Sequence, residues 1–104
     1  MTDRKAQILS FLDADPQSSF LLFALAKEYE NENKHTEAIS IYEKLLAFNG
    51  EYTGAYYHLG KQYIAINNIN AAHHIFTQGI EICKKLNAQH DASELRSALD
   101  DIEE

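Results

Sequence analysis

The sequence predicts an all-α protein of about six helices, which follow one another as antiparallel neighbours in a single domain. Apolar residues recur three and four positions apart, as in Ala38, Ile41 and Leu45, and this spacing places them on one helix face. The breaks between such stripes are short and polar, as at 31–34 and 67–68. Connections this short make each helix turn back on the one before it. A chain of 104 residues fits one domain of this kind.

The first three helices are expected at about residues 3–13, 17–31 and 35–48. Asp15-Pro16 suits the start of the second helix, because Asp accepts hydrogen bonds from free backbone N–H groups and Pro fits the first turn. Asn49-Gly50 suits the end of the third helix.

The last three helices are expected at about residues 53–66, 69–86 and 90–103. Tyr56, Leu59 and Tyr63 form one stripe in the fourth helix. Asn67-Asn68 separates it from the fifth. The sixth is expected to be apolar on one side and acidic on the other, with an apolar stripe of Ala92, Leu95, Leu99 and Ile102.

Two stretches of the chain align without a gap at an offset of 34 residues: 22–42 and 56–76. A period of 34 residues built from paired helices resembles the tetratricopeptide repeat, whose pattern combines Leu-Gly, Tyr, Ala and Phe at fixed positions. The second copy matches with Leu59, Gly60, Tyr63, Ala72 and Phe76, and the first with Leu25, Ala26, Tyr29, Ala38 and Tyr42.

The resemblance implies a right-handed superhelix of antiparallel helix pairs, an α-solenoid. Small residues are expected where paired helices approach closely: Ala26, Ala38, Gly60 and Ala72. The rings of Tyr29, Tyr42, Tyr63 and Phe76 would fill the wider spaces. One domain over 1–104 is then divided into a truncated repeat (3–16, with Ile8 and Phe11 in its core), two full repeats (19–52 and 53–86) and a capping helix (90–103).

The end of the chain departs from the repeat. Continuing the 34-residue step places Ser93-Glu94 where Leu-Gly is expected, so residues 90–103 are interpreted as a polar cap rather than a third copy. The terminal Pro of the family pattern is also absent from both full copies, where Gly50 and Lys84 stand.

Charge and composition exclude several classes of function. The formal charge is −7, with −4 over 1–52, +2 over 53–90 and −5 over 91–104. Such a chain lacks the clustered basic surface that nucleic-acid binding requires. No signal peptide and no membrane span are expected. The single cysteine, Cys83, cannot form an intrachain disulfide, which fits the reducing cytoplasm.

By resemblance, the first helix of each pair lines a concave face that binds an extended or helical peptide. The candidate peptide-binding residues lie off the packing stripes of these helices: Phe23, Lys27, Glu30, Tyr57, His58, Lys61 and Ile64. Phe23 and Tyr57 share one repeat position, and Lys27 and Lys61 share another. Paired lysines beside paired aromatics predict a protein or peptide ligand with acidic and apolar character.

No catalytic residue, metal site or cofactor is predicted. His73, His74 and His90 lack the spacing of a metal site, and Cys83 is expected to be a buried apolar filler. Some relatives hold the acidic tails of chaperones with a clamp of Lys, Asn and Arg residues. At the matching positions of this chain, only Lys27 could serve in such a clamp.

The alternative is structural self-association, in which the chain forms a weak homodimer rather than a monomer. An array of so few repeats leaves apolar surface exposed at its two ends. Its expected contacts are Ile8, Phe11 and Leu12 at one end, and Leu95, Leu99 and Ile102 at the other. An accessory subunit of a larger assembly fits the sequence equally well. The sequence also leaves open whether the acidic last helix occupies the concave groove.

Overall fold

A computed structural model describes residues 3–103, which form six helices joined by short turns. The helices are α1 (Arg4–Ala14), α2 (Ser19–Asn31), α3 (His35–Phe48), α4 (Gly54–Ala65), α5 (Ile69–Leu86) and α6 (Gln89–Glu103). Each begins and ends within two residues of its expected limits, so the all-α prediction is confirmed. Met1, Thr2 and Glu104, which the predicted domain includes, lie outside the described residues.

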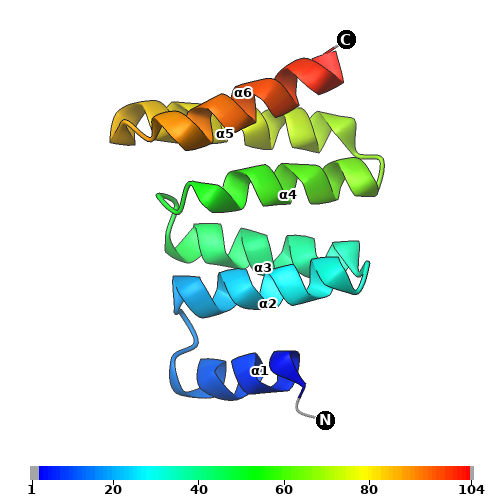
Figure 1. Ribbon diagram of the computed structural model, residues 1–104, viewed down its shortest axis with the longest axis vertical. Helices are drawn as coiled ribbons and strands as arrows, with labels where there is room; N and C mark the ends of the chain where they lie inside the picture. The colour runs from blue at the N-terminus through cyan, green and yellow to red at the C-terminus, as the bar shows by residue number, and fades with distance from the viewer. Residues whose placement is uncertain (1–2, 104) are drawn as a thin grey trace.

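The helices are stacked in chain order along the longest axis of the molecule, with the two termini at opposite ends (Figure 1). Successive helices run antiparallel, and each packs on the one before it. Helix α6 also contacts α4, its second neighbour in the chain. The chain therefore forms a short α-solenoid in which α4 and α6 run in the same direction, with α5 as the intervening helix.

Asparagine residues in left-handed conformation make three of the turns. Asn33 (φ 59°) and Asn67 (φ 67°) follow α2 and α4, and Asn87 (φ 57°) follows α5. In the first two turns the next residue donates its N–H across the turn, Lys34 to Tyr29 at 2.9 Å and Asn68 to Tyr63 at 2.8 Å. Asn tolerates this conformation better than most residues, which explains why Asn marks these breaks.

The start of α2 differs from the expected one. Ser18 caps the helix, and its hydroxyl oxygen accepts a hydrogen bond from the N–H of Leu21 at 3.3 Å. Asp15 ends α1 instead, because its own N–H is bonded to the carbonyl of Phe11 at 3.1 Å. The prediction that Asp15-Pro16 begins the second helix was wrong, since these residues form the turn between α1 and α2.

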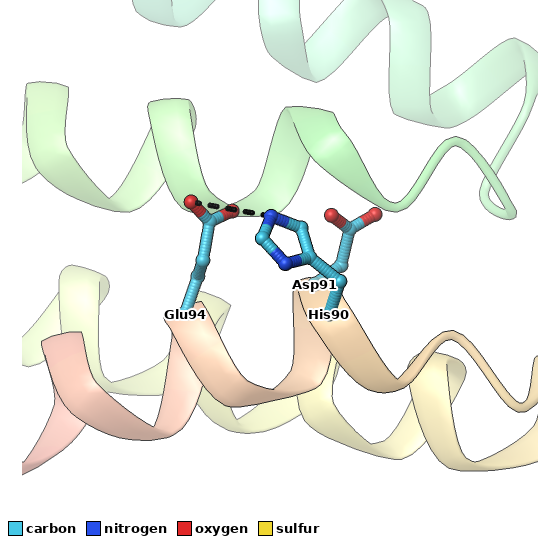
Figure 2. Close-up of side chains that lie close together, drawn as sticks. All are labelled: His90, Asp91 and Glu94. Carbon is cyan, nitrogen blue, oxygen red and sulfur yellow. Dashed lines mark ion pairs between the residues drawn. The ribbon is translucent and has the colours of Figure 1, made fainter.

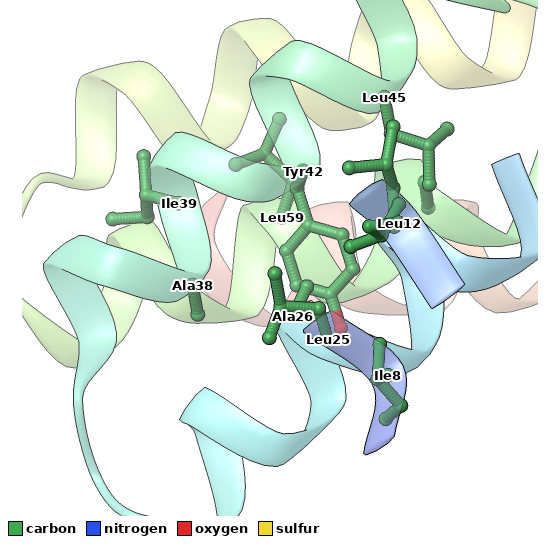
Figure 3. Close-up of a cluster of buried hydrophobic side chains, with 11 residues drawn as sticks. Ile8, Leu12, Leu25, Ala26, Ala38, Ile39, Tyr42, Leu45 and Leu59 are labelled. Carbon is green, nitrogen blue, oxygen red and sulfur yellow. The ribbon is translucent and has the colours of Figure 1, made fainter. Parts of the chain in front are cut away.

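Small residues bring the helices of each pair together, as expected. Ala26, Ala38 and Ala72 are fully buried, and Figure 3 places the first two within the N-terminal half of the core. At Gly60, an added Cβ would lie only 2.1 Å from Cε1 of Phe76. The glycine therefore makes room for the ring, which confirms the predicted close approach at Gly60. The complete burial of the three alanines agrees with the same prediction.

A second close approach was not predicted from the sequence. An added Cβ at Gly79 would lie 2.7 Å from Cβ of Tyr56 and 2.9 Å from Cδ1 of Leu95. Helix α5 is thus enclosed at one position by both α4 and α6.

In α1, the core residues are Ile8 and Leu12, whereas Phe11 is 61% exposed. Helix α1 packs mainly against α2, and residues four positions apart share the face that it presents. The expectation that Phe11 belongs to the core was wrong because its side of α1 meets no other helix of residues 3–103.

Helix α6 continues the array. Its buried residues Ala92 and Leu95 follow Tyr56 and Leu59, their counterparts in α4, by 36 residues rather than 34. Because of two additional residues before α6, the apolar face of α6 packs against α5 and α4. The uninterrupted 34-residue frame did not predict this packing. The acidic last helix forms part of the solenoid and does not lie across it as a ligand would.

Candidate functional site: the groove face

The predicted peptide-binding residues lie on one side of the solenoid, where α2, α4 and α6 are neighbours. We call this surface the groove face. It comprises Phe23, Lys27 and Glu30 of α2, Tyr57, His58, Lys61 and Ile64 of α4, and the adjoining polar side of α6. None of the seven predicted residues is fully buried, and Lys61 is exposed.

A cluster of rings joins α2 to α4 at the centre of the groove face. The ring centroid of Phe23 lies 5.3 Å from that of His58 and 5.4 Å from that of Tyr52. His58 is also stacked on Tyr42 at 5.9 Å, and Tyr57 meets it edge-on at 5.6 Å. Phe23 and Tyr57 are therefore held by neighbouring rings while part of each side chain remains accessible.

Glu30 is engaged within the chain. The Tyr42 hydroxyl donates a hydrogen bond to its carboxylate, and Nδ1 of His58 lies 3.3 Å from Oε2. Burial alone would raise the pKa of Glu30, but the hydrogen bonds from His58 and Tyr42 outweigh it and lower the pKa. Glu30 and His58 thus tie α2, α3 and α4 together.

We expect this carboxylate to make stability depend on pH. Because the pKa of Glu30 is lowered in the folded chain, its stabilising contribution is present above the unfolded pKa of about 4.3 and is lost as the pH falls through the folded value. The free energy of unfolding, measured with urea between about pH 3 and 7, should fall less steeply in Glu30→Gln than in the wild type. Glu51→Gln, at an exposed site, should follow the wild type; equal slopes for all three proteins would contradict the assignment.

The two predicted lysines line separate depressions of the groove face. Lys27, Phe20 and Phe23 line one of about 440 Å³ beside α1 and α2. Lys61 and Tyr57 line another of about 310 Å³ between α4 and α6. The Lys61 ammonium lies 5.9 Å from the centroid of the Tyr57 ring. The sequence correctly grouped the residues by helix, but it did not predict that α6 supplies the opposite wall.

Three potential metal ligands meet at the start of α6. Figure 2 shows His90, Asp91 and Glu94 extending from the same side of this helix, and their ligand atoms lie within 4.8 Å of one another. Asp91 already accepts a hydrogen bond from the hydroxyl of Thr53, and His90 and Glu94 are exposed. We therefore interpret the cluster as an exposed helix start rather than a metal centre.

Two further candidates for chemistry are occupied or inaccessible. His73 is paired with Glu103 at 2.9 Å. Cys83 is buried, and burial raises the pKa of its thiol, which disfavours the nucleophilic thiolate.

The solenoid and its groove face define a helical repeat protein. A family model described as tetratricopeptide repeat matches residues 21–52. The chain is 34% identical to a tetratricopeptide repeat domain protein from Salinibacter ruber, whose solution structure superposes with a TM-score of 0.80 over 85% of this chain and 89% of that one. The chain therefore belongs to the tetratricopeptide repeat family.

Two further structures share the fold. A protein from Bordetella parapertussis is 20% identical, with a TM-score of 0.86 over 98% of this chain and 89% of that chain. MamA is 17% identical, with a TM-score of 0.71 over 94% of this chain and 64% of that chain. No curated protein is significantly similar in sequence.

Proteins with this fold commonly mediate protein–protein interaction, and they are typically scaffolds without catalytic activity. Within residues 3–103, every helix falls short of the combination of length and apolar character that crossing a lipid bilayer requires.

Proposed function

We propose that this chain is a non-catalytic scaffold that binds a peptide or protein segment on its groove face. One observation supports this most directly. Lys27 and Lys61 occupy the same repeat position, each beside a depression lined by an aromatic residue, and neither has an ion-pair partner within residues 3–103. Two ammonium groups that form no ion pair among these residues, each next to an accessible ring, suit a ligand with acidic and apolar side chains.

The cluster of rings on the groove face also supports peptide binding there. Phe23 and Tyr57 are each in contact with other rings, so little side-chain freedom remains to be lost when a ligand binds. Aromatic residues of this kind carry much of the affinity of protein interfaces, while charges chiefly steer and orient the partner. A cytoplasmic location is part of the proposal, because a single cysteine fits a reducing compartment.

Self-association, or service as an accessory subunit, is the second candidate, and its contact residues need correction. Ile8, Leu12 and Leu95 fill the core of their own chain, so they are unavailable to a second copy. Of the expected contacts, Phe11 is 61% exposed, and Leu99 and Ile102 are partly buried. Phe20, which was not among them, is 70% exposed near the N-terminal end of the solenoid. A monomer in light scattering at high concentration would rule out the homodimer.

Charge reversal on the groove face tests the proposal. The wild type, Lys27→Glu/Lys61→Glu and the matched control Lys44→Glu/Lys84→Glu would each be immobilised and exposed to a lysate of the source cell. The control lysines are exposed on α3 and α5 and change the net charge equally. We expect proteins retained by the wild type and the control to be lost from the groove variant, with all three chains equally helical by circular dichroism. Equal retention by the groove variant would refute a ligand at these lysines.

A further inference from the structure

We infer that the α4–α6 end of the groove face binds a basic side chain, so that the partner segment presents acidic and apolar groups to α2 and Lys or Arg to α6. This rests on the proposed function and specifies the chemistry of its ligand. Because both lysines of the repeats attract acidic groups, the lysines alone do not predict a basic residue in the ligand. The prediction comes from the wall that α6 contributes.

The polar side of α6 faces Tyr57 and Lys61 across the 310 Å³ depression. Six residues of α6 line this wall, and four of them follow one another at helical spacing: His90, Glu94, Ser97 and Asp101. The opposite side of the helix is buried through Ala92 and Leu95, so α6 cannot turn its acidic stripe away without losing its core contacts.

A hydrogen bond fixes the position of this wall along α4. The hydroxyl of Thr53, just before α4, donates to Asp91 in the first turn of α6. Since the two helices run in the same direction, this contact sets their register, and the depression extends along both from that point. The helix that carries the carboxylates is therefore held in place before any ligand arrives, so binding has only their side chains to order.

The two depressions carry opposite net charge. Beside α2, Arg4 and Glu28 are paired at 3.2 Å and neutralise each other, which leaves the ammonium of Lys27. Between α4 and α6, the carboxylates of Glu94 and Asp101 outnumber the single ammonium of Lys61. His90 lies 4.0 Å from Glu94 and adds a positive charge only when it is protonated. If Lys61 pairs with Glu94, the carboxylate of Asp101 remains for a ligand.

The surroundings of these carboxylates suit a Lys or Arg side chain. Aromatic faces attract cations, and the Tyr57 ring already has the Lys61 ammonium 5.9 Å from its centroid. Charged hydrogen bonds to Glu94 or Asp101 would hold the head group, and Ser93 and Ser97 offer further acceptors. Lys61 is exposed, and the four-carbon stem of a lysine allows its ammonium to move toward an acidic group of the ligand.

A random 12-residue peptide display library is the probe that we would use. It would be selected against the wild type, against Glu94→Gln/Asp101→Asn, and against the matched control Glu81→Gln/Asp100→Asn, whose exposed carboxylates lie outside the depression. We expect Lys or Arg at a fixed position in peptides from the wild type and the control, and no such enrichment with the α6 variant. A wild-type peptide should bind the α6 variant roughly tenfold more weakly in fluorescence anisotropy, as expected for losing a hydrogen bond to a charged group.

Two failures are distinguishable. In the first, the selected peptides no longer bind Lys27→Glu/Lys61→Glu, so they depend on the groove face, but they lack a basic residue or bind the α6 variant as tightly as the wild type. That result overturns the inference and leaves the proposed function standing. If no selected peptide depends on the groove face, the proposed function fails, and the inference fails with it.

Discussion

Replacing Phe76 with Ala is expected to lower the free energy of unfolding by about 3–5 kcal/mol. The side chain is fully buried, at 0% exposure, and its ring occupies the space that the absent side chain of Gly60 leaves on α4. Truncation removes the ring from the contact between α4 and α5, and rigid helices cannot close the cavity completely. Urea unfolding followed by far-UV circular dichroism would measure the change.

A matched control and a double-mutant cycle sharpen this prediction. Phe20→Ala removes a ring that is 70% exposed and should change stability by no more than about 0.5 kcal/mol. Gly60→Ala alone should destabilise by about 1–3 kcal/mol, since its methyl group would overlap the Phe76 ring. With Phe76→Ala the methyl group has room, so the double variant should lose less than the sum of the two. Strict additivity would show that the ring and the glycine do not share this space.

The helices could be predicted because the buried face of a helix is determined by the spacing of apolar residues that are close together in the sequence. A stripe at three- and four-residue spacing identifies the buried face of each helix, and the turn after α2 recurs after α4 with the same asparagine conformation. Small residues such as Ala26 and Gly60 were equally visible, because the repeat places them where two helices must approach.

Features that depend on distant neighbours could not be predicted in this way. Whether Phe11 or Leu12 of α1 is buried depends on which helices surround α1, and spacing alone permits either. Gly79 has a role only because Tyr56 and Leu95 approach it from two different helices. The 34-residue frame assumed a connection of constant length, so the two additional residues before α6 moved its register without a signal in the repeat itself.

The candidate site was predicted in part for the same reason. Helical spacing predicted that Phe23 and His58 both lie off the packing stripes, but their contact depends on how closely α2 and α4 lie. Tyr52 packs against Phe23 from a loop. The sequence predicted the acidic side of the last helix, but not that this side forms a wall of the groove face. Glu94 and Asp101 lie between the apolar positions of the last stripe, and this indicates a polar side that a further first helix would turn toward the groove face.

Leu95→Ala is expected to destabilise the chain by about 2–5 kcal/mol, and its effect should be largest in α6. Leu95 is fully buried, with its Cδ1 2.9 Å from the Cβ position of an Ala at Gly79. Helix α6 lies at the end of the stack and packs mainly against α5 and α4. In a linear array each unit is stabilised by its neighbours, so the loss of this contact should let α6 open before the rest unfolds.

Hydrogen exchange would distinguish local from global loss. Amides of α6 should exchange faster in Leu95→Ala than in the wild type, by a larger factor than those of α2 and α3. Leu86→Ala, which truncates a leucine that is 41% exposed, should leave both unchanged. If α6 opens in this way, the acidic wall opposite Lys61 is lost with it, so peptides that require Glu94 and Asp101 should bind Leu95→Ala weakly even where α2 and α4 remain folded. Unchanged protection of α6 would instead mean that the remaining buried contacts hold it, and that the groove face does not depend on this leucine.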